Sequence, residues 1–297
     1  MKIRASIATA SLLGLRNYRI DAHPATLYFL LPLPCRAACK YCYLRQGKLG
    51  RVKWPEFGIE EIVKKIEDGI AGRICIQTTY NKKTLSMLYE FLDRMDASIP
   101  VSISINPISI EEMEMLKEYG VERLGFGIDA CSEAIFKKWK YGTPSWKEYI
   151  EAIKNAKEIF GKATAHLIIG LGESDEEAIN AMKFFSMNGI DIALFAYTKN
   201  NETMVELPRY RAIQIARYFI KEAEFSFKNG KLEEILLPEI NKEAFRTSGC
   251  PDCNRPFYNE RVTKIYNYPF ALNELQTKKA MEEARKYARI YIAAGKR

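Results

Sequence analysis

Histidine is almost absent from the sequence: only His23 and His166 occur among 297 residues. The sequence therefore argues against reactions that need a histidine base and against a metal held mainly by imidazoles. We expect both histidines to be structural. The chain also lacks any run of about 18 apolar residues, which argues against a membrane-spanning helix. Its N-terminal segment has a basic start but no apolar core before a small-residue cleavage site, so we expect a cytoplasmic protein.

The net charge of +8 is spread over many expected helices and never gathers into a basic block with interleaved aromatic residues. The lack of such a block argues against a nucleic-acid partner. The excess of lysine and arginine fits a solvated surface, and the alternatives are an acidic protein partner or a phosphate-bearing ligand.

Cysteine is the most informative residue type that is present. An odd number of cysteines without a secretory signal argues against a disulfide framework and for metal binding or redox chemistry. The seven cysteines are Cys35, Cys39, Cys42, Cys75, Cys131, Cys250 and Cys253.

Short β-branched runs alternate with amphipathic helices over most of the chain, which predicts an α/β fold, a (β/α) barrel of the TIM type. Two helix starts are marked by capping boxes, Ser109 with Glu112 and Ser174 with Glu177. The eighth strand position, around residues 243–247, is irregular and runs into a cysteine-rich turn. The expected strands are Thr26–Leu31, Arg73–Thr78, Val101–Ile105, Arg123–Ile128, Ala163–Ile169, Ile190–Tyr197 and Glu224–Phe227.

We expect three regions along the chain. An N-terminal extension covers residues 1–25, the barrel covers 26–260 with a cysteine-rich segment at 247–260, and a helical extension covers 261–297 with a helix near Leu272–Ala294. In barrels of this type the chemistry lies at the C-terminal ends of the strands. By that rule all seven cysteines are expected at one rim.

Cys35, Cys39 and Cys42 form the run Cys-Arg-Ala-Ala-Cys-Lys-Tyr-Cys. Three thiolates at this spacing can ligate three irons of one [4Fe-4S] cluster and leave the fourth iron open. The alternatives are a zinc loop or three ordinary buried cysteines, but zinc prefers four ligands and no fourth ligand is near in the sequence.

This motif closely resembles that of the radical S-adenosylmethionine (SAM) superfamily. The resemblance implies that SAM chelates the open iron and is cleaved to methionine and a 5′-deoxyadenosyl radical. It also implies that Tyr41 lies near the adenine, as do Gly170 and Gly172 after the fifth strand. Asp129, at the end of the fourth strand, resembles a carboxylate that binds the ribose hydroxyls; the alternative is a helix cap.

One position departs from the superfamily pattern. Many members have Gly-Gly-Glu at the end of the second strand to hold the amino group of SAM, whereas residues 75–80 of this chain read Cys-Ile-Gln-Thr-Thr-Tyr. The hydroxyl groups of Thr78 and Thr79 are the candidates to replace that motif.

Four cysteines remain, which is enough to complete a second cluster, and we expect it to be an auxiliary [4Fe-4S] cluster. Cys250 and Cys253 are the strongest pair because a Cys-x-x-Cys run places two thiolates on one metal. Rival interpretations are a zinc knuckle or a disulfide at this pair, and inert packing for Cys131. Cys75 completes the expected set.

From about residue 25 to 258 the chain resembles biotin synthase, a family in which the cysteine after the second strand ligates an auxiliary cluster that donates its sulfur. Cys75 falls at that place. The other ligand positions of that family fall at Ser102, near Thr164 and near Ser226. The resemblance therefore does not extend to a biotin-synthase-type [2Fe-2S] cluster.

Residues 247–260 (Thr-Ser-Gly-Cys-Pro-Asp-Cys-Asn-Arg-Pro-Phe-Tyr-Asn-Glu) resemble instead the archaeal two-component lipoyl synthases of the LipS type. This resemblance implies a sulfurtransferase of lipoate biosynthesis that inserts sulfur into an octanoyl chain on a carrier-protein lysine, with the auxiliary cluster as sulfur donor. The implied partners are the octanoylated lipoyl carrier (an H protein or an acyltransferase lipoyl domain), a second lipoyl synthase subunit and a ferredoxin-like reductant. Neither nucleic acid nor a membrane is implied.

Other functions stay open at this point. Within the same chemistry, a radical SAM isomerase or carbon–carbon lyase of the methylornithine synthase or hydrogenase-maturation type would not consume cluster sulfide. From other classes, the alternatives are an iron–sulfur scaffold or electron carrier without catalysis, and a zinc-stabilised binding module.

Overall fold

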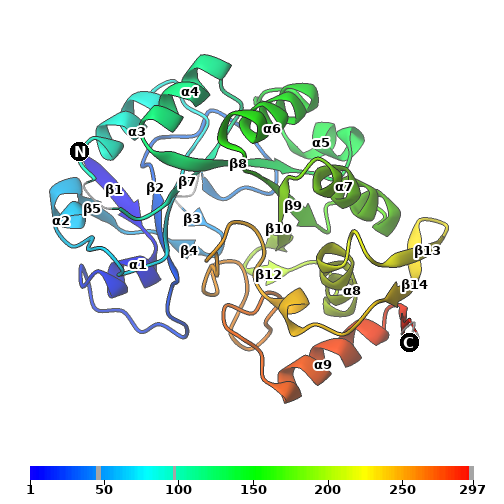
Figure 1. Ribbon diagram of the computed structural model, residues 1–297. Coiled ribbons are helices and arrows are strands. Elements are labelled where there is room, and N and C mark those ends of the chain that lie inside the picture. The colour runs from blue at the N-terminus through cyan, green and yellow to red at the C-terminus, as the bar shows by residue number, and fades with distance from the viewer. Residues whose placement is uncertain (45–47, 96–97, 294–297) are drawn as a thin grey trace.

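The computed structural model describes residues 1–44, 48–95 and 98–293. Its centre is an eight-stranded sheet in which six neighbouring strands run parallel and in chain order (Figure 1). Each is a short apolar run that is largely buried, as a parallel strand covered on both faces requires. These strands are β2 (Thr26–Leu30), β6 (Arg73–Gln77), β7 (Val101–Ile105), β8 (Val121–Asp129), β9 (Ala163–Ile169) and β10 (Asp191–Ala196).

Helices cover the outer side of this sheet, as Figure 1 shows. The capping boxes expected at Ser109 and Ser174 are confirmed, and Ser145 with Glu148 adds a third. Each box satisfies backbone N–H groups of the first turn, so the helix begins at a defined residue. The helices between β6 and β10 are α3 (Thr84–Leu92), α4 (Ile110–Glu118), α5 (Glu133–Trp139), α6 (Trp146–Phe160) and α7 (Asp175–Met187).

The N-terminal residues are part of the same sheet. The strand β1 (Lys2–Ala5) pairs antiparallel with β2 on one side and with β5 (Glu56–Gly58) on the other. The short helices α1 (Ile7–Leu12) and α2 (Ile59–Val63) follow β1 and β5. The expected extension over residues 1–25 is therefore built into the central sheet rather than lying apart from it.

The sheet does not close into a barrel, and the predicted seventh barrel strand is wrong. The strand β13 (Glu224–Lys228) does form, but it pairs antiparallel with β14 (Lys231–Leu237) in a separate three-stranded sheet. Its residues alternate between half-buried and exposed, whereas a central parallel strand is buried on both faces. The hairpin of β11 (Thr198–Lys199) and β12 (Glu202–Thr203) and the helix α8 (Leu207–Tyr218) lie between β10 and this sheet in the chain.

The C-terminal region is only partly helical. The helix α9 spans Glu274–Arg285, and the chain then forms β15 (Arg289–Ile292), which pairs parallel with β14. The expected helix up to Ala294 is therefore too long, and Ala294 itself lies outside the described residues. The backbone of β15 pairs with an edge of the small sheet, which a helix would leave open. No helix in the described ranges is long and apolar enough to span a membrane.

Residues 246–268, here termed the closing segment, lie beside β10 in the place of the missing barrel strands (orange in Figure 1). A short 3₁₀ turn, Lys242–Phe245, leads into the segment. The amide of Leu194 in β10 donates to Ser248 Oγ at 2.9 Å, and its carbonyl accepts from Arg255 Nη2 at 3.2 Å. Side chains of the closing segment thus satisfy the free edge of β10, which a neighbouring strand would otherwise do.

The same segment also reaches the first strands of the sheet. Thr26 Oγ1 donates to the carbonyl of Asp252 at 2.8 Å, and Arg73 Nε donates to the carbonyl of Pro251 at 3.0 Å. The hydroxyl of Tyr28 accepts from the amides of residues 254 and 255, both at 2.9 Å. Since Thr26 and Arg73 begin β2 and β6, the segment crosses the N-terminal ends of these strands.

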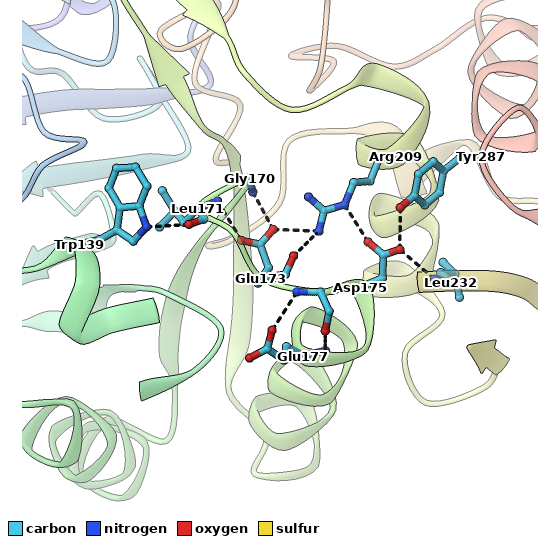
Figure 2. A network of polar contacts seen from close by, with 10 residues as sticks. Trp139, Gly170, Leu171, Glu173, Asp175, Glu177, Arg209, Leu232 and Tyr287 are labelled. Carbon is cyan, nitrogen blue, oxygen red and sulfur yellow. Dashed lines mark hydrogen bonds and ion pairs between the residues drawn. The ribbon is translucent and has the colours of Figure 1, made fainter. Parts of the chain in front are cut away.

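A buried ionic network ties α7 and α8 to the small sheet (Figure 2). Arg209 contacts Glu173 at 3.0 Å and Asp175 at 2.8 Å, and both carboxylates are almost fully buried. Asp175 Oδ2 also accepts from the amide of Leu232 and the hydroxyl of Tyr287, at 2.8 and 2.7 Å. Every partner is hydrogen-bonded, which is the condition under which a buried charge is tolerated.

This network makes Asp175 a strong determinant of stability. Replacing Asp175 with alanine leaves Arg209 without one carboxylate and deprives the Leu232 amide and the Tyr287 hydroxyl of their acceptor. We expect Asp175→Ala to lower the free energy of unfolding by about 3 kcal/mol or more, measured by chemical denaturation. The exposed neighbour Glu176 provides the control, and Glu176→Ala should cost less than about 1 kcal/mol. Equal losses in both variants would contradict this account.

Candidate active site

A cavity of about 290 Å³ lies against one face of the six parallel strands and the closing segment. Side chains at alternate strand positions face it, as the two-residue period of a strand requires. Six of the seven cysteines line this cavity, namely Cys35, Cys39, Cys42, Cys75, Cys250 and Cys253. All seven cysteines are free thiols.

The loop that carries Cys35, Cys39 and Cys42 follows β2 and is held through its backbone. The amides of Ala38 and Lys40 donate to the carbonyls of Tyr141 and Trp139, at 2.8 and 2.9 Å. The amide of Arg36 donates to the carbonyl of Tyr80 at 2.9 Å, in the connection that follows β6. Residues 139–141 therefore pair with this loop much as a short strand would, and they fix where its three thiols lie.

The second group of thiols lies deeper in the cavity. Cys75 is the central residue of β6 rather than its end, and its sulfur accepts from Gln77 Nε2 at 2.9 Å. Cys250 and Cys253 come from the closing segment, near the N-terminal ends of the strands. The sulfur of Cys250 lies 3.4 Å from Thr164 Oγ1, and that of Cys253 lies 3.5 Å from the Tyr28 hydroxyl.

The prediction that all cysteines lie at one rim is wrong. Cys131 follows β8 but is buried in the apolar core and does not line the cavity. The charged groups that influence its thiol are Glu173, Arg209 and Glu177, which belong to the network behind the sheet. Burial raises the pKa of this thiol well above its usual value. The inert packing that the sequence left open for Cys131 describes its position, and we drop it as a cluster ligand.

The six thiols of the cavity come from three parts of the chain, namely the loop after β2, the strand β6 and the closing segment. Within residues 1–44, 48–95 and 98–293, no three Cys, His, Asp or Glu side chains are grouped closely enough to hold a single metal ion. Iron–sulfur clusters take thiolates on several separate irons, so their ligands are spaced more widely.

Burial favours the neutral form of four of these thiols, those of Cys39, Cys42, Cys75 and Cys253. It raises the pKa of Cys42 to about 12 and raises the pKa values of Cys39, Cys75 and Cys253 as well. Arg255 acts in the opposite direction on Cys253, with Nη1 at 3.6 Å from the sulfur. Because metals bind thiolates, loading a metal here must release protons, and the Arg255 guanidinium favours that step.

Asp129 provides an acidic group to the cavity, beside the loop of the first three thiols. Its Oδ2 accepts from Lys140 Nζ at 2.9 Å and from the hydroxyl of Tyr41, the residue before Cys42. Burial alone would lower the pKa of Lys140, but the charge of Asp129 outweighs it and the pKa is raised. Lys140 Nζ also contacts the hydroxyl of Tyr149 at 3.2 Å. The N-cap position of the helix that follows is held by Ser132 and not by Asp129, so the alternative role of Asp129 as a helix cap finds no support.

The other expected SAM contacts are only partly brought together. Thr78 lines the cavity, but its hydroxyl donates to the carbonyl of Ser104 at 2.9 Å. Thr79 also lines the cavity, and its buried Oγ1 has no hydrogen-bond partner among the described residues. Gly170 and Gly172 follow β9 as expected but do not line the cavity; the amide of Gly170 donates instead to Glu173 at 2.7 Å (Figure 2).

Several cavity residues were not foreseen as site residues from the sequence, among them Tyr28, Lys140, His166 and Arg255. Only Arg255 carried a local signal, since it follows Cys253 by two positions. Lys140 looks in the sequence like the exposed Lys137 and Lys138 beside it. The folded chain alone distinguishes it, because α5 ends at Trp139 and the next side chain turns inward.

His166 gives the stability a pH dependence that can be assigned to one residue. Burial lowers its pKa to about 4, whereas an unfolded histidine titrates near 6.5. Its contribution is therefore complete above about pH 6.5 and is lost as the pH falls toward 4, because the unfolded chain then binds the extra proton. We expect the cluster-free protein to lose about 1.5 kcal/mol between pH 6.5 and 5 through this group. The measurement is chemical denaturation at both pH values. The same loss in His166→Gln would refute the assignment.

Comparisons with known proteins agree with this geometry. The chain is 25% identical over 233 residues to a biotin synthase of Hydrogenobaculum sp. (72% of this chain, 69% of the relative), and 24% identical over 235 residues to that of Persephonella marina (73% and 68%). Among solved structures, methylornithine synthase (PylB) superposes with a TM-score of 0.52 over 96% of this chain and 75% of that one, at 13% identity.

A second fold neighbour is the FeFe-hydrogenase maturase HydG of Carboxydothermus hydrogenoformans. It has a TM-score of 0.50 and 16% identity over 72% of this chain, which spans 55% of that longer protein. The family model of the radical SAM superfamily matches residues 34–185, from just before Cys35 to the end region of α7. This match covers half of the chain, and the chain belongs to the radical SAM superfamily.

Proposed function

We propose that Cys35, Cys39 and Cys42 hold the [4Fe-4S] cluster that membership of the superfamily implies, with SAM bound between them and Asp129. When bound, this cluster and SAM supply a 5′-deoxyadenosyl radical. Two features of the chain support the fit: three thiols on one anchored loop face the cavity, and the unpartnered Thr79 hydroxyl faces it as well. Asp129 offers carboxylate oxygens to the ribose hydroxyls, and Tyr41 lies against it.

We further propose that Cys75, Cys250 and Cys253 hold an auxiliary [4Fe-4S] cluster. The observation that carries this proposal is that these three thiols line the same cavity as the first three. When bound, such a cluster supplies sulfide to a substrate radical formed in that cavity. Tyr28 and Gln77 donate to the sulfurs of Cys253 and Cys75, and such hydrogen bonds tune a cluster.

The reaction that uses both sets of thiols is sulfur insertion at an unactivated carbon. We propose that the substrate is an octanoyl chain on a lysine of a lipoyl carrier protein, as the sequence of residues 247–260 suggests. Ile168, Ala193 and Phe195 give the cavity apolar walls, against which an alkyl chain can pack. No histidine base is needed for such chemistry, and the buried His166 stays neutral at physiological pH.

Three partners belong to this proposal. They are the octanoylated carrier domain, a second lipoyl synthase subunit that shares the two sulfur insertions, and a ferredoxin-like reductant. The net charge of +8 would steer an acidic carrier domain toward the enzyme.

The direct test is to incubate the anaerobically reconstituted protein with SAM, a reductant and an octanoyl-lysine peptide, with and without the second subunit. We expect 5′-deoxyadenosine and a peptide that has gained one sulfur, detected by mass spectrometry. Release of 5′-deoxyadenosine without any gain of sulfur would contradict the proposal. It would favour an isomerase or a carbon–carbon lyase of the same superfamily.

Cysteine variants separate the two sets of thiols. In Cys250→Ala we expect 5′-deoxyadenosine to be formed but the sulfur gain to be lost, because only the deeper set is incomplete. In Cys35→Ala both products should be lost. Cys131→Ala serves as the matched control, since this thiol lies outside the cavity, and should keep both products and the full iron content. Loss of iron in Cys131→Ala would return that residue to the list of ligands.

A further inference from the structure

Lys140 is the only lysine apart from Lys48 among the cavity-lining residues of the described chain, and it is almost completely buried. Its Nζ bonds to Asp129 Oδ2 at 2.9 Å, to the Tyr149 hydroxyl at 3.2 Å and to the carbonyl of Gly127. The ring of Tyr149 also lies 4.4 Å below the ammonium group. A lysine fixed on so many sides is set to hold other groups in place rather than to reach toward a ligand.

The group that it holds has an unusual backbone. Asp129 has a φ of +65°, and the amide of Ala130 donates to the carbonyl of Ile128 at 2.7 Å, which closes a three-residue turn around Asp129. A residue other than glycine in this region costs about 1–3 kcal/mol and persists only where its surroundings impose it. Lys140 supplies that constraint, because it bonds both to the carbonyl before the turn and to the carboxylate within it.

Lys140 is itself tied to the loop of the first thiols. Its neighbours Trp139 and Tyr141 accept backbone hydrogen bonds from Lys40 and Ala38 of that loop. The side chain of Lys140 points from this pairing to Asp129. Residues 139–141 thus contact both the loop that carries the three thiols and the Asp129 carboxylate, and they fix the position of one relative to the other.

We propose that Lys140 is a positioning residue that aims the Asp129 carboxylate at the ribose hydroxyls of SAM. Lys140 and Tyr41 both bond to Oδ2, and Asp129 lines the cavity, so we assign the contact with the ribose to Oδ1. The inference rests on the proposed role of Asp129 in binding SAM. Without Lys140 the turn relaxes, and the recognition of the ribose weakens while the cluster ligands stay in place.

The test is equilibrium binding to the reconstituted enzyme. Adenosine and 2′-deoxyadenosine compete with S-adenosylhomocysteine, and the ratio of their dissociation constants reports the contact with the ribose hydroxyl. In Lys140→Met we expect this ratio to fall by about tenfold, the value of one hydrogen bond to a charged group, with an unchanged iron content. Lys137→Met, an exposed lysine paired only with Glu133 on the same helix, is the control and should keep the wild-type ratio.

A double variant separates positioning from a general loss of structure. If Lys140 acts through Asp129, Lys140→Met should add nothing to Asp129→Asn. A normal ratio in Lys140→Met, together with a lowered ratio in Asp129→Asn, would overturn the inference alone. A normal ratio in Asp129→Asn would overturn the assignment of the SAM site as well. Should Lys140→Met fail to fold, Tyr149→Phe removes one contact of Nζ and is expected to lower the ratio about threefold; no change there would also overturn the inference.

Discussion

The backbone of Leu194 lies at the free edge of the last parallel strand, and its amide and carbonyl need partners that no further strand supplies. A buried edge without partners would cost several kcal/mol, so something must cover it. Ser248 and Arg255 do so from an irregular segment that runs on to the beginnings of β2 and β6. Cys250 and Cys253 lie within that segment. The contacts that cover the edge of β10 therefore also place these two thiols in the cavity.

This arrangement explains why the two sets of thiols lie at different levels along the strands. The first three thiols follow a strand end, where a parallel sheet usually carries its chemistry. The other three lie among the strands, since Cys75 is in the middle of β6 and the closing segment crosses the opposite ends. A substrate between them would be enclosed by the strands on one side and the segment on the other. Such enclosure keeps water from a reactive carbon radical.

The electrostatics follow from the same burial. Burial raises the pKa values of Cys39, Cys42, Cys75 and Cys253, so these four thiols are neutral in the absence of metal. Two cations also line the cavity, the buried Lys140 and the half-buried Arg255, and both can interact with negatively charged groups bound there. Each cation is fixed by several bonds, so neither has to be ordered when a ligand binds. In the cavity, Asp129 forms an ion pair with Lys140, and Arg255 lies beside Cys253, where it would balance the charge of the thiolate that a metal binds.

Local patterns in the sequence were enough for the parallel strands and the helix starts. The strands β7 and β9 and three residues of the first thiol motif follow from periodicity and spacing, which depend on nearby residues only. The strand β13 lies in a different sheet from the expected one. Its residues alternate between half-buried and exposed, which is typical of a strand with one covered face and not of a central parallel strand. The closing segment has no period at all, so the contact between Tyr28 and Cys253, 225 residues apart, could not be foreseen.

The direction of individual side chains is the second feature that could not be predicted from the sequence. Cys75 lies within a strand and Cys131 just after one, and the sequence does not show that Cys131 faces the core while Cys75 faces the cavity. A shift of one residue along a strand reverses the face, and the exact strand end is the least certain feature of a pattern. The burial of Lys140 could not be predicted for the same reason, because it depends on α5 ending at Trp139.

We propose that sulfide from a cluster held by Cys75, Cys250 and Cys253 reaches a substrate radical formed beside Cys35, Cys39 and Cys42. The most direct measurement loads the protein with isotopically heavy sulfide during reconstitution and follows a single turnover on an octanoyl-lysine peptide. The account predicts that the sulfur gained by the peptide is heavy and that Cys250→Ala abolishes this gain. A peptide that gains only light sulfur from solution, or none, would contradict it.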